Sequence, residues 1–277
     1  MPTVEKDTNE DIYTEEKITG VFSKLLQREV DVTILMPAEK KGQVYPLLLL
    51  NDGQDLEKLK VKETIEQLTA EGIIHKIIVA AVTAGDRMQE YGVAARRDYL
   101  KRGSRARAYT KYIVSELIPY LTYRYPVDPH SRHTIAGCSM GGLSALDIAW
   151  HHAALFSKVG AFSGSFWWRK RDSKSRLYSD TRDRIMHQQI RSGRKKADMK
   201  FWFEAGTEDE KSDRNKNGII DSIDDTLDLV AELTKKGYRP FHDIQYLEVK
   251  DGHHNIETWA AAMPAFLTWA FEKSSIQ

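Results

Sequence analysis

Short apolar runs alternate with longer helical patterns along most of this chain. The apolar runs predict strands at residues 30–36, 45–50, 76–82, 133–136, 158–163, 200–204 and 244–249. The stretches between them predict helices at residues 61–71, 105–124, 141–153, 221–236 and 256–273. Parallel strands need a crossover, which is usually a helix, so the alternation predicts an α/β fold. Several runs are apolar throughout, as expected of a mostly parallel sheet covered by helices on both faces.

Length and composition favour a single domain. Of the 277 residues, 41% are hydrophobic, which is enough to bury one large core. We see no internal repeat and no low-complexity linker. We therefore predict one domain over residues 1–277.

A basic segment, residues 169–196, interrupts the alternation. It holds 11 basic and 3 acidic residues and shows no strand pattern. Charge runs are usually exposed faces, so we predict a solvated helical lid or insert. The alternative is that its positive charge attracts an anionic substrate or partner.

The charge balance limits the partners to expect. Lys and Arg number 41 against 40 Asp and Glu, a net charge of +1, which gives no reason to expect a nucleic acid. Cys138 is the only cysteine, which excludes an internal disulfide and fits a reducing compartment. The sequence leaves the oligomeric state open.

No segment has the pattern of a membrane span or a secretory leader. The first twenty residues are acidic and polar, and the longest apolar runs, 47–50 and 77–82, are too short to cross a bilayer. We therefore expect a soluble, cytoplasmic protein with no membrane partner.

The sequence Gly137-Cys138-Ser139-Met140-Gly141 has the pattern Gly-x-Ser-x-Gly. It directly follows a predicted strand and opens a predicted helix, which is the setting of the nucleophile elbow of α/β-hydrolases. Such a turn strains the serine backbone, and the flanking glycines remove side chains that would collide there. We therefore predict that Ser139 is a nucleophile.

Two backbone N–H groups are candidates for an oxyanion hole. The Met140 N–H lies at the start of the helix, where free amides and the helix dipole favour negative charge. The second donor should come from the loop after an earlier strand. Gly53 lets the backbone there approach a substrate closely, so we favour the Gln54 N–H.

A serine nucleophile needs a histidine base and a carboxylate to orient it, in the chain order Ser, acid, His. His253 and His254 both lie after the last predicted strand, so either could be the base. The loop after the strand at 200–204 offers three acids: Glu208, Asp209 and Glu210.

Beyond the elbow, further residues match a known family: 50–55, Arg87 with Glu90 and Tyr91, 116–119, 162–168, and His254 and Asn255 with Trp259. From about residue 30 to the C-terminus, the chain resembles the "Putative esterase" family of α/β-hydrolases, which includes enterochelin esterases, feruloyl esterase domains and S-formylglutathione hydrolases. The resemblance implies an α/β-hydrolase fold.

The same resemblance selects among the candidate acids and bases. It implies that Asp209, in the position after Gly-Thr-x, is the acid and that His254, before Asn255, is the base. Four more residues are candidates to line the substrate pocket, with an ion pair and a packed aromatic cluster as the alternative: Arg87, Glu90, Tyr91 and Trp167.

Residues 213–224 match the EF-hand calcium loop at several positions. The candidate ligands are Asp213, Asn215, Asn217, Ile219, Asp221 and Asp224. Asp224 is shorter than the usual glutamate, and the alternative is a plain Asn-Gly turn before a helix. A bound Ca²⁺ would be structural, because serine chemistry needs no metal nucleophile and no other cofactor.

The combined hypothesis is a serine esterase that hydrolyses a small-molecule carboxylic ester through an acyl-enzyme. One alternative is acyl transfer to a sugar or another alcohol, which would need an acceptor groove beside Trp167 and Trp168. The other is a calcium-dependent binding module without catalytic activity.

Overall fold

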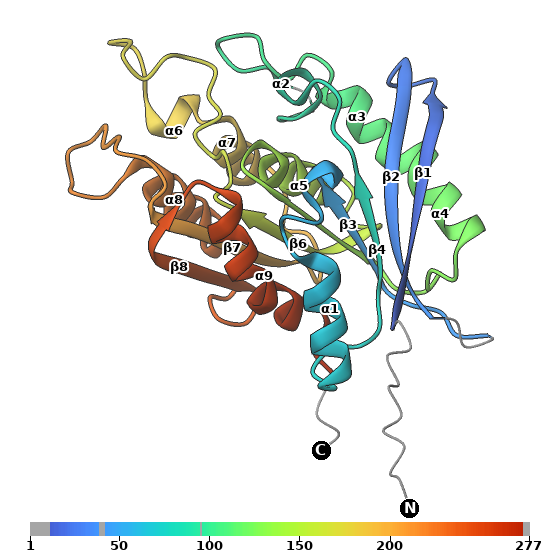
Figure 1. Ribbon diagram of the computed structural model, residues 1–277. Coiled ribbons are helices and arrows are strands. Elements are labelled where there is room, and N and C mark those ends of the chain that lie inside the picture. The colour runs from blue at the N-terminus through green and yellow to red at the C-terminus, as the bar shows by residue number, and fades with distance from the viewer. Residues whose placement is uncertain (1–11, 39–41, 95, 274–277) are drawn as a thin grey trace, which may run out of the picture.

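One sheet of eight strands organises the molecule in the order β1–β2–β4–β3–β5–β6–β7–β8 (Figure 1). The computed structural model describes residues 12–38, 42–94 and 96–273. The strands are β1 Tyr13–Ser23, β2 Arg28–Pro37, β3 Leu47–Asn51, β4 Ile78–Val82, β5 His133–Cys138, β6 Phe156–Phe162, β7 Lys200–Glu208 and β8 Ile244–His253. The first two strands run antiparallel to their neighbours, and the six others are parallel to one another.

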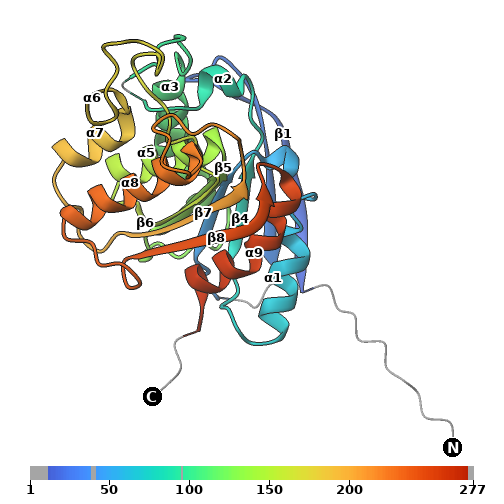
Figure 2. The ribbon, with the colours of Figure 1, turned by 90° about the vertical axis from the view of Figure 1, so that its left-hand side faces the viewer.

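Helices cover both faces of this sheet (Figure 2). They are η1 Gly53–Asp55, α1 Val61–Ala70, α2 Arg87–Glu90, α3 Ala106–Tyr112, η2 Ile113–Leu117, α4 Ile118–Arg124, α5 Met140–His151, α6 Asp180–Asp183, α7 Ile185–Ser192, α8 Asp221–Lys235 and α9 Ile256–Phe271. One apolar cluster joins the sheet to α3, α4, α5, α7 and α8, and the other joins its opposite face to α1 and α9. The predicted α/β-hydrolase architecture is confirmed.

The strand β1 has no counterpart in the sequence prediction. Only its two end residues, Tyr13 and Ser23, are buried, and most side chains between them are exposed. It is an edge strand that pairs with β2 through its backbone, so it needs no apolar face and leaves no apolar pattern.

The basic segment 169–196 is not wholly solvated, which corrects the expectation for it. It contains α6 and α7, and α7 buries Ile185, Met186, His187 and Ile190. This happens because α7 packs on α8, whose acidic side chains bind arginines of the segment. Half of α7 is therefore core.

No described helix is long and apolar enough to cross a membrane. Residues 1–11, which carry about half of the sequence used to judge a leader, lie outside the described residues.

Candidate active site

Ser139 lies at the sharp turn between β5 and α5. Its backbone has φ 54° and ψ −120°, a conformation that L-residues rarely adopt. The Ser139 N–H donates to the Phe162 carbonyl at 2.8 Å, which ties the turn to the end of β6. A Cβ atom on Gly137 would lie 2.6 Å from the backbone of Gly141, so the turn depends on glycine. The result is a partly exposed hydroxyl at the N-terminus of a helix.

His254 follows the end of β8 and reaches this hydroxyl. Its Nε2 lies 2.9 Å from the Ser139 Oγ. The next residue, Asn255, caps α9 by accepting a hydrogen bond from the Thr258 N–H at 3.0 Å. The backbone N–H of His253 donates to the Thr258 hydroxyl at 2.9 Å, so both residues beside His254 are held by the first turn of α9.

Asp209 follows the end of β7, on the other side of the histidine. Its Oδ2 lies 3.9 Å from His254 Nδ1, and its side chain is fully buried. Neither Asp209 oxygen has a hydrogen-bond partner among the described residues. A distance of 3.9 Å is an ion-pair separation, longer than a hydrogen bond; such contacts are often long without substrate.

Gln54 lies in η1, which follows β3, and Met140 is the first residue of α5, directly after Ser139. Asp52 adopts a left-handed conformation with φ 63°, which turns the chain sharply after β3. A Cβ on Gly53 would lie 2.5 Å from the Ala81 carbonyl oxygen, so only glycine allows this close approach to β4. Within the described ranges, neither the Gln54 nor the Met140 N–H donates to a protein acceptor.

Two of the four candidate pocket residues do not face the pocket, which corrects the prediction for them. Tyr91 is fully buried, and its hydroxyl accepts a hydrogen bond from the Asp52 N–H at 3.0 Å. Glu90 is buried and binds Arg28 through two hydrogen bonds of 2.8 and 2.7 Å. The alternative prediction therefore holds for both residues. Glu90 forms an ion pair with Arg28, and Tyr91 is a packed aromatic residue whose hydroxyl binds the Asp52 N–H.

Arg87 and Trp167 are more accessible. Arg87 forms two hydrogen bonds to Asp52, of 2.6 and 3.0 Å, with part of its side chain exposed. The Arg102 guanidinium lies 4.7 Å from the centroid of the half-buried Trp167 ring. Both residues keep surface that a substrate could contact.

Ser165 belongs to the site, although no role was predicted for it from the sequence. Its hydroxyl lies 3.3 Å from the Ser139 Oγ, and its N–H donates to the Ser139 carbonyl at 3.1 Å. The signal lay in the matching stretch 162–168, in which a hydroxyl closely follows a strand that neighbours the elbow.

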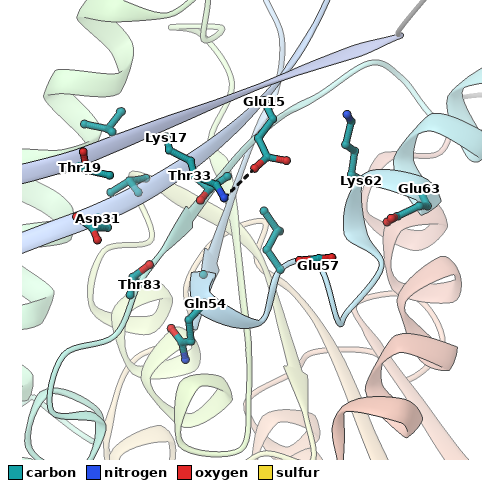
Figure 3. Close-up of a pocket in the computed structure, with 14 residues that line it drawn as sticks. Glu15, Lys17, Thr19, Asp31, Thr33, Gln54, Glu57, Lys62, Glu63 and Thr83 are labelled. Carbon is teal, nitrogen blue, oxygen red and sulfur yellow. Dashed lines mark ion pairs between the residues drawn. The ribbon is translucent and has the colours of Figure 1, made fainter.

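One hollow opens at His254, and another lies at the candidate pocket residue Trp167. The larger, of about 880 Å³, is lined by His254, Trp259, Ile256 and the lysines at positions 58 and 60. The other, of about 710 Å³, is lined by Trp167, Glu210 and residues of the basic segment. A third hollow, of about 290 Å³, lies between the β1–β2 hairpin and the segment around Gln54 and Glu57, and none of the three candidate catalytic residues lines it (Figure 3).

The loop 213–224 gathers oxygen-bearing side chains. Asp213 accepts from the backbone N–H of Asn217 and of Gly218, at 3.2 and 2.9 Å. Asp224 accepts from the amides of Asn215 and Asn217, at 2.7 and 3.0 Å. Such oxygens are ligands that Ca²⁺ prefers.

Two observations limit this loop as a metal site. Asp221 pairs with the Arg214 guanidinium at 3.0 Å, so its predicted place among the ligands is not met. The Ile219 N–H donates to the Asn217 side chain at 2.8 Å, a contact that does not involve the Ile219 carbonyl oxygen, the atom that would bind the ion. In the described part of the chain, no three His, Cys, Asp or Glu side chains form a metal-binding group.

The sheet order and the elbow after β5 define an α/β-hydrolase. Its solved structural neighbours include a ferulic acid esterase, with 21% identity and a TM-score of 0.70 over 94% of this chain and 98% of that one. Another is the enterobactin esterase FES from Shigella flexneri, with 22% identity and a TM-score of 0.71 over 92% of this chain and 58% of that one. These likenesses concern the fold.

The chain belongs to the "Putative esterase" family, whose model matches residues 23–270. It is a carboxylic ester hydrolase. A relative, the "Uncharacterized protein YbbA" of Bacillus subtilis (strain 168), is 23% identical over 219 residues, which are 76% of this chain and 80% of YbbA.

Proposed function

We propose that this enzyme hydrolyses its ester in two acyl-transfer steps, with Ser139 as nucleophile, His254 as general base and Asp209 as the carboxylate that orients it. The observation that carries the proposal is the 2.9 Å separation of the His254 Nε2 and the Ser139 Oγ. At that distance the imidazole can take the hydroxyl proton as the oxygen attacks.

In the first step the Ser139 oxygen attacks the ester carbonyl carbon, and His254 accepts the proton. The carbonyl oxygen becomes an oxyanion, which the N–H groups of Gln54 and Met140 stabilise. The intermediate then collapses, the bond to the alcohol oxygen breaks, and His254 returns the proton to the leaving alcohol. Ser139 is left acylated.

In the second step water attacks the acyl-enzyme, and His254 takes the proton from that water. Collapse of the second intermediate releases the carboxylic acid and returns the proton to Ser139. Throughout, the Asp209 carboxylate lies beside the histidine Nδ1 and favours the imidazolium that forms in each step.

Two observations favour hydrolysis over the alternatives. Acyl transfer would need an acceptor groove beside Trp167 and Trp168, and of these two residues only Trp167 lines a hollow, because Trp168 is fully buried and donates its indole N–H to the Arg96 carbonyl at 3.1 Å. Membership of an esterase family argues against a binding module without catalytic activity.

The proposal is tested with Ser139→Ala and a p-nitrophenyl ester. We expect kcat to fall on the order of 10⁴-fold or more, because the nucleophile is removed. The control is Ser192→Ala, since the Ser192 hydroxyl donates to the backbone carbonyls of Gln188 and Gln189 in α7 and lies outside the proposed machinery. Turnover by Ser139→Ala at a rate near that of the wild type would refute the mechanism.

We further propose that the loop 213–224 binds Ca²⁺ through Asp213, Asn215, Asn217, the backbone carbonyl of Ile219, and Asp224. The ion would stiffen the connection between β7 and α8, and it takes no part in the chemistry. Adding Ca²⁺ to chelator-treated protein should raise the melting temperature of the wild type but not of Asp213→Ala. An equal response of the two proteins, or none, would contradict it.

A further inference from the structure

Glu204 is a buried carboxyl that the proposed mechanism does not use. It lies on β7, five residues before Asp209, and is fully buried. Its Oε2 accepts hydrogen bonds from the Ser163 N–H at 3.1 Å and from the Ser163 hydroxyl at 3.3 Å. Its Oε1 has no hydrogen-bond partner in the described part of the chain.

Ser163 connects this carboxyl to the face of the site that holds His254. The residue directly follows β6 and has a left-handed backbone with φ 43°. Its hydroxyl accepts the indole N–H of Trp259 at 2.9 Å. An indole nitrogen only donates, so the hydroxyl must direct its own hydrogen to Glu204. The chain of hydrogen bonds therefore runs in one direction, from Trp259 through Ser163 to Glu204.

Trp259 in turn packs against the base. Its ring meets that of His254 edge to face, with centroids 5.2 Å apart and planes at 84°. This geometry is favourable for an aromatic pair and restricts rotation of the imidazole. Fixing the indole at its nitrogen therefore also limits the orientations open to His254.

The charges around Glu204 indicate which form it takes. Burial, and then the nearby charge of Asp209, raise the pKa of Glu204 to about 8. Other titratable groups that face it are Tyr246 on β8 and Cys138 on β5, and burial raises the pKa of both. At pH 7, Glu204, Tyr246 and Cys138 are therefore neutral and place no second negative charge beside Asp209.

We propose that Glu204, in its neutral form, is a positioning residue that holds His254 toward Ser139 through Ser163 and Trp259. The inference rests on the proposed serine mechanism. It assigns no contact between Glu204 and the substrate. The role requires an acceptor oxygen for Ser163 and the absence of a second buried anion.

The first test compares Glu204→Leu with Glu204→Gln at pH 7. The leucine removes the acceptor, and we expect kcat to fall about tenfold, the worth of about one hydrogen bond, with little change in KM. Glutamine keeps an acceptor oxygen and should recover most of the lost kcat. Equal kcat values in both variants would overturn the proposal.

The second test is the pH profile. In the wild type, Glu204 ionises above about pH 8, and repulsion between two buried carboxylates should lower kcat there. Glu204→Gln cannot ionise and should lack this fall. A fall of the same size and midpoint in both proteins would overturn the proposal.

Trp259→Phe keeps an aromatic ring but loses the indole N–H, and it covers the case in which Glu204→Leu fails to fold. We expect kcat to fall severalfold with KM unchanged, because one hydrogen bond is lost. The control is Trp269→Phe, at another tryptophan of α9, which packs on Phe266. Wild-type kcat in Trp259→Phe would refute the proposal.

The failure of this inference can be told apart from the failure of the serine mechanism. An active Ser139→Ala variant would refute the mechanism itself. An inactive Ser139→Ala variant, together with wild-type kcat in the Glu204 and Trp259 variants, would refute only this inference.

Discussion

At the level of single residues, the position after the last predicted strand could not decide whether His253 or His254 is the base. Side chains of successive residues in an extended chain point in opposite directions, so one backbone path brings only one of the two rings to the serine. The structure brings His254 to Ser139. The resemblance to esterases had implied the same residue, whereas the position after the last strand left both open.

The carboxylate can be tested at the same scale. Asp209→Asn keeps the size of the side chain but removes the charge and offers an amide that can favour the wrong tautomer of His254. We expect kcat on a p-nitrophenyl ester to fall about 10³- to 10⁴-fold, with a smaller effect on KM. Glu208→Gln is the control, since Glu208 is exposed, and similar losses in the two variants would refute the role of Asp209.

Glu204 could not be recognised from the sequence. It ends the predicted strand 200–204, after three aromatic residues, and nothing in the pattern separates a buried carboxyl from a solvated one. Its environment is made by residues that are far away in the sequence. Ser163 lies 41 residues from Glu204, and Trp259 lies 96 residues from Ser163. Ser139, in contrast, was predictable because strand, turn and helix adjoin it in the chain.

At the scale of elements, two strands run further than the apolar pattern predicts. The strand β7 continues to Glu208 and β8 to His253, and these two residues pair in the sheet. The polar ends carry no apolar alternation, so the sequence placed them in loops. This pairing places Asp209 and His254 side by side, because they are the residues that directly follow Glu208 and His253.

The contact of α7 with α8 also went unseen in the sequence, and it can be tested. Arg184 is buried and binds Asp225 at 2.7 Å. Arg184→Met would leave Asp225 with Arg214 alone, and we expect a loss of about 3 kcal/mol in the free energy of unfolding, measured in urea.

An exposed arginine is the control for this prediction. Arg239 pairs with Asp243 at 3.4 Å, and most of its side chain is exposed. Arg239→Ala should change the free energy of unfolding by less than about 0.5 kcal/mol. Losses of equal size in the two variants would show that the α7–α8 contact does not depend on the buried pair.

At the scale of the whole molecule, the alternation of strands and helices predicted the architecture well, because parallel strands need crossovers. The antiparallel edge strand β1 was missed because most of its side chains are exposed, so it has no apolar face that would leave a pattern in the sequence. The excess positive charge of residues 169–196 is partly neutralised by acids of α8, which the arginines at positions 184 and 191 bind. The basic segment thus lies against an acidic helix, and the two local excesses of charge offset each other in the folded chain.

In the proposed mechanism, His254 activates a Ser139 hydroxyl that would otherwise be a poor nucleophile. Labelling with a fluorophosphonate, with the adduct located by mass spectrometry, tests this activation. We expect one label per chain, on Ser139, in the wild type and in His253→Ala, and little labelling in His254→Ala, because the base is lost. A label on another residue, or equally fast labelling of Ser139 without His254, would contradict the account.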